Sequence, residues 1–467
     1  MTATVGEGVE ALRTVMSGPV FIPADADYEN ARLIWNGDID RHPAVIAQCQ
    51  TQQDVVTAVG FAQREGLEIA VRGGGHGISG SAVCEGGLMI DLSGMRNVVV
   101  DPERRRAVVG GGASLAEMDA ATQAHGLAVT GGVVSHTGVA GLTLGGGMGW
   151  LTRKLGLSID NLEAVEVVLA DGRCLRASAD SHPDLFWAMR GGGGNFGIVT
   201  SFEFRLHPVG PEIHLALLFW GLDQGHGALQ TARDGIPGAA RGHIYPLLCV
   251  ALNAPPAPFV PAQHHFAPGY ALLLVGFGSA DEHAQAVAPI RAGCPPLFEF
   301  TTPILYTALQ QLFDESPFAW GIRAYEKALY LDELSDEAID VVVERATDRT
   351  SSMSFMPIFR LDGAFSRVGE QDTAFGGTRT PQYVVNIIAI SPDAAALAAD
   401  RKWVRSVWDG LRPLAASASG YVNFDAEHDN DRVRATYGST KYDRLAQIKA
   451  QYDPGNVFHR NANITPA

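Results

Sequence analysis

The chain has 467 residues, of which 46% are hydrophobic and 18% charged, a composition typical of a globular protein that can bury a full core. A net formal charge of −16 argues against nucleic acid or an anionic membrane as a partner. No basic-apolar leader or membrane-length apolar run is seen, and five scattered cysteines indicate neither a disulfide framework nor a metal site, so we expect a reduced, cytoplasmic protein.

The first elements are a helical pattern that runs through Trp35 and a short buried strand over residues 43–47. Thr51 then has the character of a helix N-cap, with Asp54 at the third helical position and Gly66 past the end. A second capped helix is predicted from Ser114, ending at Gly126. Strands and helices that alternate in this way predict a layered domain of both element types.

A glycine-rich loop at residues 71–81 follows the apolar run 67–71. Glycines allow positive φ angles and a close approach of ligand to backbone, and consecutive N–H groups form a nest that suits a diphosphate. The loop matches neither the G-x-G-x-x-G fingerprint nor a P-loop. His76 stands in its middle, and the residues alone leave open whether it binds a ligand or a turn.

Two more glycine-rich segments follow, at residues 131–150 and 190–197. A hairpin is predicted between them at residues 162–178, and an alternating strand at residues 198–206 comes after the second. Two such loops about 60 residues apart in one domain, at residues 71–81 and 131–150, are hard to explain by packing alone. We expect them to share one extended, diphosphate-containing ligand.

After Pro208 the chain changes character. The sequence predicts an antiparallel sheet covered by helices on one face. The strands are expected at residues 214–220, 270–276, 353–361 and 383–390, with helices at 335–347 and 391–411. The second helix would open with Ser391 and Pro392 as its cap and first turn.

Several motifs together resemble the flavin-binding fold of the berberine-bridge-enzyme-like oxidases, within the vanillyl-alcohol-oxidase/p-cresol-methylhydroxylase (PCMH) superfamily. They are Arg72 to His76, residues 134–141, residues 145–150, residues 184–197, residues 421–423 and residues 452–464. They occur in family order over nearly the whole chain, and the style is closest to bacterial members that tailor polyketides and other secondary metabolites.

The resemblance implies an α+β fold with a two-subdomain PCMH-type FAD-binding domain and an α/β substrate domain. The expected divisions are an N-terminal segment at residues 1–39, the FAD domain at 40–208, the substrate domain at 209–415 and a returning segment at 416–467. The cofactor implied is FAD, linked covalently through His76. Relatives with a second, cysteinyl link carry it where this chain has Val134, so a single link is expected. Cys84 is read as a small buried residue.

The family pattern also assigns further residues to cofactor contacts. These are Arg72, Gly73, Gly74, Gly75, Gly77, Ser81, Val134, Ser135, Gly138, Gly141, Gly145, Gly146, Gly149, Trp150, Ile198, Val199, Asn423, Asn461 and Asn463.

For catalysis, the resemblance points to Tyr421, which could act as a base only if its pKa falls from about 10. His136 is a second candidate for acid–base or substrate contact, and Thr137 matches the residue that controls oxygen access to the flavin. Other relatives place a carboxylate on the strand that matches residues 354–360, where this chain has none. That departure points to an apolar, aromatic substrate, and Arg360 is expected to pair with Asp362 on the surface.

The favoured function is that of an FAD-dependent oxidase or oxygenase of a small aromatic or polyketide-type metabolite, with hydride transfer to flavin N5 and reoxidation by O2. A dehydrogenase or a carbohydrate oxidase of the same family, or a non-redox cyclase or binding protein, stays open. The sequence does not fix the substrate, the base or the oligomeric state.

Overall fold

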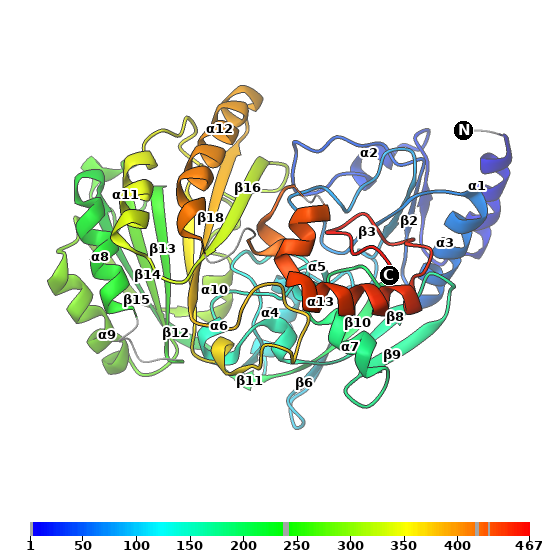
Figure 1. The fold of residues 1–467 in the computed structure, drawn as a ribbon, viewed down its shortest axis with the longest axis horizontal. Coiled ribbons are helices and arrows are strands. Elements are labelled where there is room, and N and C mark those ends of the chain that lie inside the picture. The colour runs from blue at the N-terminus through cyan, green and yellow to red at the C-terminus, as the bar shows by residue number, and fades with distance from the viewer. Residues whose placement is uncertain (1–2, 237–241, 416–419, 428–429) are drawn as a thin grey trace.

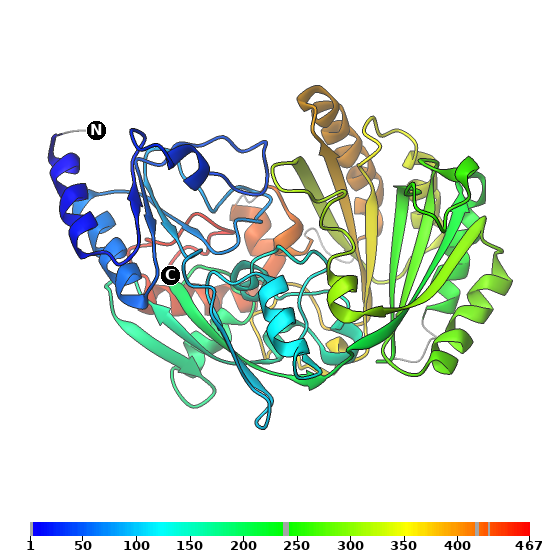
Figure 2. The ribbon, with the colours of Figure 1, turned by 180° about the vertical axis from the view of Figure 1, so that it is seen from behind.

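The computed structural model describes residues 3–236, 242–415, 420–427 and 430–467. Two lobes lie side by side in both views, with the N-terminal half and the C-terminal helix in one and the large sheet in the other (Figures 1 and 2). Among the described residues, no helix combines the length and apolar character needed to cross a bilayer. The division expected after residue 415 borders residues 416–419, which lie outside the described part.

The first subdomain is a four-stranded sheet in the order β1-β2-β4-β3. Its elements are α1 (Ala3–Val15), β1 (Val20–Phe21), α2 (Tyr28–Ala31), β2 (Val45–Gln48), α3 (Gln52–Glu65), β3 (Ile69–Arg72) and β4 (Leu88–Asp91). The capping box of Thr51 and Asp54 is present, and Gly66 ends α3 in the left-handed region, as predicted. The helix expected through Trp35 is wrong, because α2 ends at Ala31.

The second subdomain is a five-stranded antiparallel sheet in the order β5-β6-β10-β8-β9. The strands are β5 (Val98–Asp101), β6 (Arg106–Gly110), β8 (Leu162–Val168), β9 (Cys174–Ser178) and β10 (Ile198–Arg205). The helices around it are α4 (Leu115–Gln123), α5 (Val139–Leu144), α6 (Thr152–Leu155), α7 (Pro183–Met189) and α13 (Asn430–Tyr452). The predicted hairpin is confirmed, but α4 ends before Gly126.

Two short strands, β7 (Leu127–Ala128) and β11 (His207–Pro208), pair where the chain leaves this subdomain. The C-terminal α13 returns across the full sequence to pack beside α7 (Figure 1). Its buried face includes Val433, Leu445 and Ile448, in one core with Phe202 and Trp187.

The other lobe holds a seven-stranded antiparallel sheet in the order β15-β12-β14-β13-β17-β18-β16. Its strands are β12 (Glu212–Gly221), β13 (Ile244–Asn253), β14 (Pro268–Gly276), β15 (Phe298–Leu305), β16 (Arg323–Leu331), β17 (Met356–Leu361) and β18 (Gln382–Ser391). The helices are α8 (Gly225–Gly235), α9 (Ala280–Gly293), α10 (Tyr306–Gln310), α11 (Asp336–Arg345) and α12 (Ala394–Leu411). The four predicted strands and two predicted helices are confirmed; β13, β15 and β16 were not predicted.

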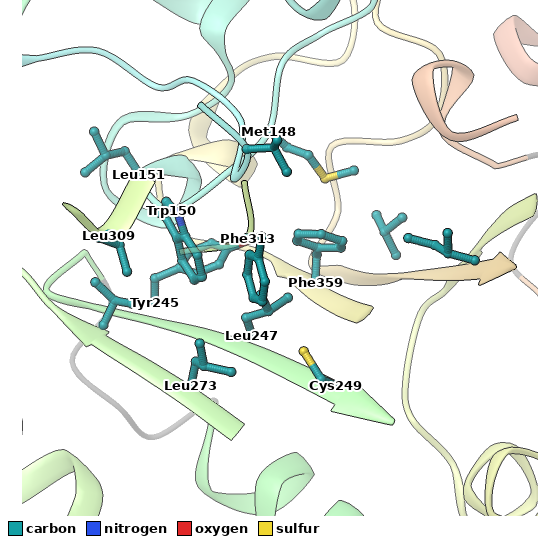
Figure 3. Close-up of a cluster of buried hydrophobic side chains, with 14 of the residues drawn as sticks. Met148, Trp150, Leu151, Tyr245, Leu247, Cys249, Leu273, Leu309, Phe313 and Phe359 are labelled. Carbon is teal, nitrogen blue, oxygen red and sulfur yellow. The ribbon is translucent and has the colours of Figure 1, made fainter. Parts of the chain in front are cut away.

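Side chains of this sheet alternate between two cores, as the period of two requires. Even-numbered β16 residues such as Ala324 and Ala328 face the core that includes Trp150, whereas Tyr325 and Leu329 face the helices. Figure 3 shows this first core, where Met148 and Trp150 of the N-terminal lobe approach Phe313 and Phe359. Helices therefore cover one face, and the glycine-rich loops cover the other.

Two local predictions need correction. Helix α12 is capped by Asp393, whose side chain accepts from Ala396 N, because Ser391 is still the last residue of β18. Arg360 does pair with Asp362, at 3.2 Å, but the pair is buried and not at the surface. Asp362 also accepts from Arg153 of the N-terminal lobe at 2.5 Å, so it holds the two lobes together.

Candidate active site

A cavity of about 350 Å³ lies between the glycine-rich loops and the uncovered face of the seven-stranded sheet. The loop after β3 lines it with Gly73 to Gly77, and the segment before α5 lines it with Thr137 and Gly138. Strands β16, β17 and β18 supply Glu326, Phe359 and Asn386 from the opposite side. The cavity therefore has one wall of backbone and one wall of side chains.

Gly74 and Gly138 bring the two glycine-rich loops into backbone contact. A Cβ on Gly74 would lie 2.3 Å from Gly138 Cα, closer than real Cβ atoms come to backbone. Leu115 N also donates to Thr137 O at 2.9 Å, so the N-terminus of α4 holds the second loop. The two loops, about 60 residues apart in sequence, thus form a single surface.

Two aromatic rings, those of Trp35 and His136, pack against His76. Its ring stacks on Trp35, with centroids 4.5 Å apart, and its Nε2 shares a hydrogen bond of 2.9 Å with His136 Nδ1. Burial and the neighbouring His136 lower the pKa of His76 to about 3, so the imidazole is neutral at neutral pH. His136 itself lies behind His76, outside the cavity lining, with its Nε2 3.4 Å from Asp314 O.

The C-terminal segment closes the far end of the cavity. Asn461 and Arg460 line it, and Asn461 Oδ1 and Arg460 Nε are buried without a hydrogen-bond partner among the described residues. Buried polar atoms normally have partners, so these two fit contacts with a polar ligand. Glycine backbone on one side and unpaired polar atoms at the end suit a long diphosphate-containing cofactor such as FAD.

The substrate-side wall is aromatic. Phe313, Phe318, Phe355, Phe359 and Phe424 line it, mostly from β17 and from the segment after α10. The strand at residues 354–360 contributes no carboxylate, as the sequence indicates. The cavity nevertheless has a buried carboxylate on this side, from β16, a strand that was not predicted.

That carboxylate is Glu326 of β16, which is 7% exposed. Asn386 Nδ2 of β18 donates to Glu326 Oε2 at 2.9 Å. Burial, reinforced by the charge of Asp425, raises the pKa of Glu326 to about 8. The signal that could have found it is the alternation of Ala324, Glu326 and Ala328, an acid at an inward position of an apolar strand.

Tyr421 lines the cavity, but its pKa is not lowered, as it would have to be for Tyr421 to act as a base. Its hydroxyl accepts hydrogen bonds from Gly147 N at 2.8 Å and Asn423 Nδ2 at 2.9 Å. Burial nevertheless raises its pKa to about 12. At neutral pH the hydroxyl keeps its proton and holds the loop at Gly147.

The remaining predicted cofactor residues divide between the lining and the layer behind it. In the lining are Gly73, Gly74, Gly75, Gly77, Ser81, Val134, Gly138, Gly141, Gly145, Ile198, Val199, Asn423 and Asn461. Behind it are Arg72, Ser135, Gly146, Gly149, Trp150 and Asn463.

The residues behind the lining have other contacts. Arg72 is in a buried ion pair with Asp91, at 2.6 Å, and Ser135 donates to Asp314. Gly149 packs on the backbone of Gly131. These contacts hold the loops in place. The residues therefore support the cavity walls without lining the cavity themselves.

Comparisons with known proteins agree with this arrangement. Residues 43–178 match the family model described as FAD binding domain, and residues 420–465 match the one described as berberine and berberine like. The uncharacterised FAD-linked oxidoreductase YgaK of Bacillus subtilis strain 168 is 30% identical, over 97% of this chain and 98% of its own. The chain belongs to the berberine-bridge-enzyme-like FAD-linked oxidoreductases.

Solved structures place this berberine-bridge-like enzyme in the same fold. The 6-hydroxy-D-nicotine oxidase of Arthrobacter nicotinovorans superimposes with a TM-score of 0.85 at 26% identity, covering 97% of this chain and 98% of that one. Glucooligosaccharide oxidase of Acremonium strictum, which has a 6-S-cysteinyl, 8α-N1-histidyl FAD, gives 0.82 at 23%, covering 98% and 99%. The berberine-bridge-like enzyme is therefore an FAD-binding oxidoreductase, and its relatives differ in substrate.

Proposed function

We propose that this berberine-bridge-like enzyme is an oxidase or oxygenase of a small aromatic metabolite of the polyketide or phenolic type, with O2 as the electron acceptor. The observation that carries the proposal is the phenylalanine-rich wall opposite the glycine-rich loops. When bound, FAD supplies a two-electron acceptor for the substrate and passes the electrons to O2. A flat apolar ring gains most from such a wall because burial of apolar surface and offset ring contacts both stabilise it.

A carbohydrate is a poorer match to this cavity. A sugar needs many hydrogen-bond partners, and buried polar groups without partners cost free energy. On the substrate-side wall, the described lining has Glu326, Asn386 and Asp425 among several phenylalanines. This is enough to orient one or two polar groups on an aromatic molecule.

His76 is proposed as the single point of covalent FAD attachment. It lines the cavity in the loop that contacts the second glycine-rich segment, and it is held by Trp35 and His136. A neutral imidazole has a nucleophilic nitrogen, which a protonated one lacks. Val134 stands where a second, cysteinyl link would need sulfur.

The test is anaerobic flavin bleaching by a panel of phenols, aromatic alcohols and aromatic amines, followed by admission of air and assay of hydrogen peroxide. We expect bleaching by some aromatic compounds, none by glucose, cellobiose or xylobiose, and peroxide release on reoxidation. Bleaching by the sugars alone would reverse the substrate assignment. A reduced flavin that stays reduced in air would identify a dehydrogenase.

A further inference from the structure

Glu326 is placed in the cavity by strand geometry. In β16, Ala324, Ala328 and Tyr330 face the core between the lobes, and the intervening Tyr325 and Leu329 face helices α11 and α12. Glu326 shares the first face, so it points toward the glycine-rich loops of the N-terminal lobe. Its neighbour Lys327 points the other way and pairs with Glu427 at 3.2 Å.

Asn386 meets Glu326 across the sheet. The register of β16 and β18 pairs Glu326 with Ile388 and Ala328 with Asn386, so the acid and the amide are diagonal neighbours on one face. The amide Nδ2 is used in the 2.9 Å bond to Glu326, whereas Asn386 Oδ1 has no partner in the described part of the chain. Asn386 is only 2% exposed, so this acceptor is directed at a ligand and not at bulk water.

Other titratable groups around the cavity have different partners. Asp425, from the segment after β18 and α12, is 2.7 Å from Arg432, and Arg460 is 2.8 Å from Glu68. His76, Tyr421 and Tyr437 are the remaining titratable residues in the described lining. Glu326, in contrast, is bonded to the neutral side-chain amide of Asn386.

We propose that Glu326, held in place by Asn386, binds the hydroxyl or amino group on the substrate carbon that is oxidised, and that Glu326 removes its proton. This inference rests on the proposed function. The O–H bond breaks, its proton passes to a carboxylate oxygen of Glu326, and its electron pair forms the second bond of a carbonyl. The C–H hydrogen leaves with its electron pair, as a hydride, to the two-electron acceptor named above, so the alcohol loses two electrons. Glu326 is a catalytic residue in this scheme, and Asn386 is a positioning residue that holds the carboxyl group through its Nδ2.

The protonation state of Glu326 should make both ketone binding and alcohol oxidation depend on pH. With its pKa raised to about 8, the side chain is mostly a neutral acid at pH 7. The neutral acid donates a hydrogen bond to a ketone, whereas the carboxylate accepts a proton from an alcohol. Ketone binding should therefore weaken, and alcohol oxidation should speed up, as pH rises through 8.

The first experiment measures binding without turnover. Acetophenone, which has no titratable group, is added to the FAD-loaded enzyme while the flavin absorbance is followed. We expect a Kd about tenfold lower at pH 6.5 than at pH 9.5 in the wild type. In Glu326→Gln the difference should vanish, because an amide donates at both pH values. Glu299→Gln, an exposed acid on β15, should behave as wild type. No binding at either pH, or the same pH dependence in Glu326→Gln, would overturn the proposal.

The second experiment uses 1-phenylethanol and anaerobic flavin bleaching. Wild-type bleaching should rise about tenfold per pH unit below pH 8, and Glu326→Gln should lose about 100-fold or more together with that rise. Unchanged bleaching in Glu326→Gln would reject the inference and leave the oxidase function intact. If none of the aromatic substrates bleaches the wild type, the proposed function fails, and acetophenone binding still decides the role of Glu326.

Discussion

Gly74 and Gly138 touch through their backbones, so that a Cβ added to either one would lie within 2.5 Å of the other residue. Gly138 is bridged to Ser114 and directly precedes α5, and Gly74 lies in the loop directly after β3. This contact joins the two loops of the proposed FAD site.

Gly74→Ala should separate the loops and impair FAD retention. Because the clash is with backbone, we expect a loss of at least about 2 kcal/mol of stability and purified protein that is largely colourless. Gly60→Ala is the control, since a Cβ there meets only the Arg64 side chain, at 3.4 Å. Flavin content and melting temperature measure the effect. A yellow, stable Gly74→Ala would mean that the contact is not required.

His76→Ala should release FAD on acid precipitation, while the wild type keeps its flavin in the pellet. The flavin-bearing peptide of the wild type should contain His76 and no cysteine, and Cys84→Ser is the matched control. We also expect slower substrate oxidation in His76→Ala, as a covalent, electron-poor ring is a stronger hydride acceptor. Flavin found on Cys84, or free in the denatured wild type, would contradict this.

Thr137→Leu should slow reoxidation in air. Thr137 lines the cavity beside Gly138, and its β-branched side chain is stiff and small. Leucine adds bulk at the same place, so oxygen has less room to approach. Thr137→Val keeps the volume and should reoxidise at nearly the wild-type rate. Equal rates in all three proteins would show that another feature controls oxygen access.

Tyr421→Phe should affect structure more than chemistry. Removing the hydroxyl leaves Gly147 N and Asn423 Nδ2 without their shared acceptor, at a cost of about 1–3 kcal/mol. We expect a lower melting temperature and less than about a tenfold loss in bleaching rate, below the loss in Glu326→Gln. A larger kinetic loss with unchanged stability would return Tyr421 to the role of base.

Glu326→Gln should stabilise the protein at alkaline pH. Burial raises the folded pKa of Glu326 to about 8, well above its ordinary value, so the contribution of Glu326 to the stability of the wild type is largest below that ordinary value and is lost as pH rises to 8. Glutamine does not ionise, and the variant should melt a few degrees higher than wild type at pH 9, with a smaller difference at pH 5. An equal difference at both pH values would show that Glu326 does not titrate in this range.

The sequence by itself determined the helix caps, the glycine-rich loops and the alternating strands, because each depends on residues that are close together in the chain. The caps of Thr51 and Ser114 follow from the spacing of acceptor and donor along one helix turn, and both capping boxes are present. Glycine runs predicted the loops of the cavity because only glycine removes the Cβ that would keep two backbones apart. Alternation predicted four strands of the large sheet, and family motifs predicted FAD.

Tertiary structure alone decided which polar groups meet. Glu326 and Asn386 are 60 residues apart and become neighbours only through the register of β16 with β18. The same packing placed His136 behind His76, and it buried the Tyr421 hydroxyl between two donors. The sequence shows only which of these side chains are acids, bases and amides. Their pKa values and partners depend on burial and on distances between strands and loops, which arise only when the chain has folded.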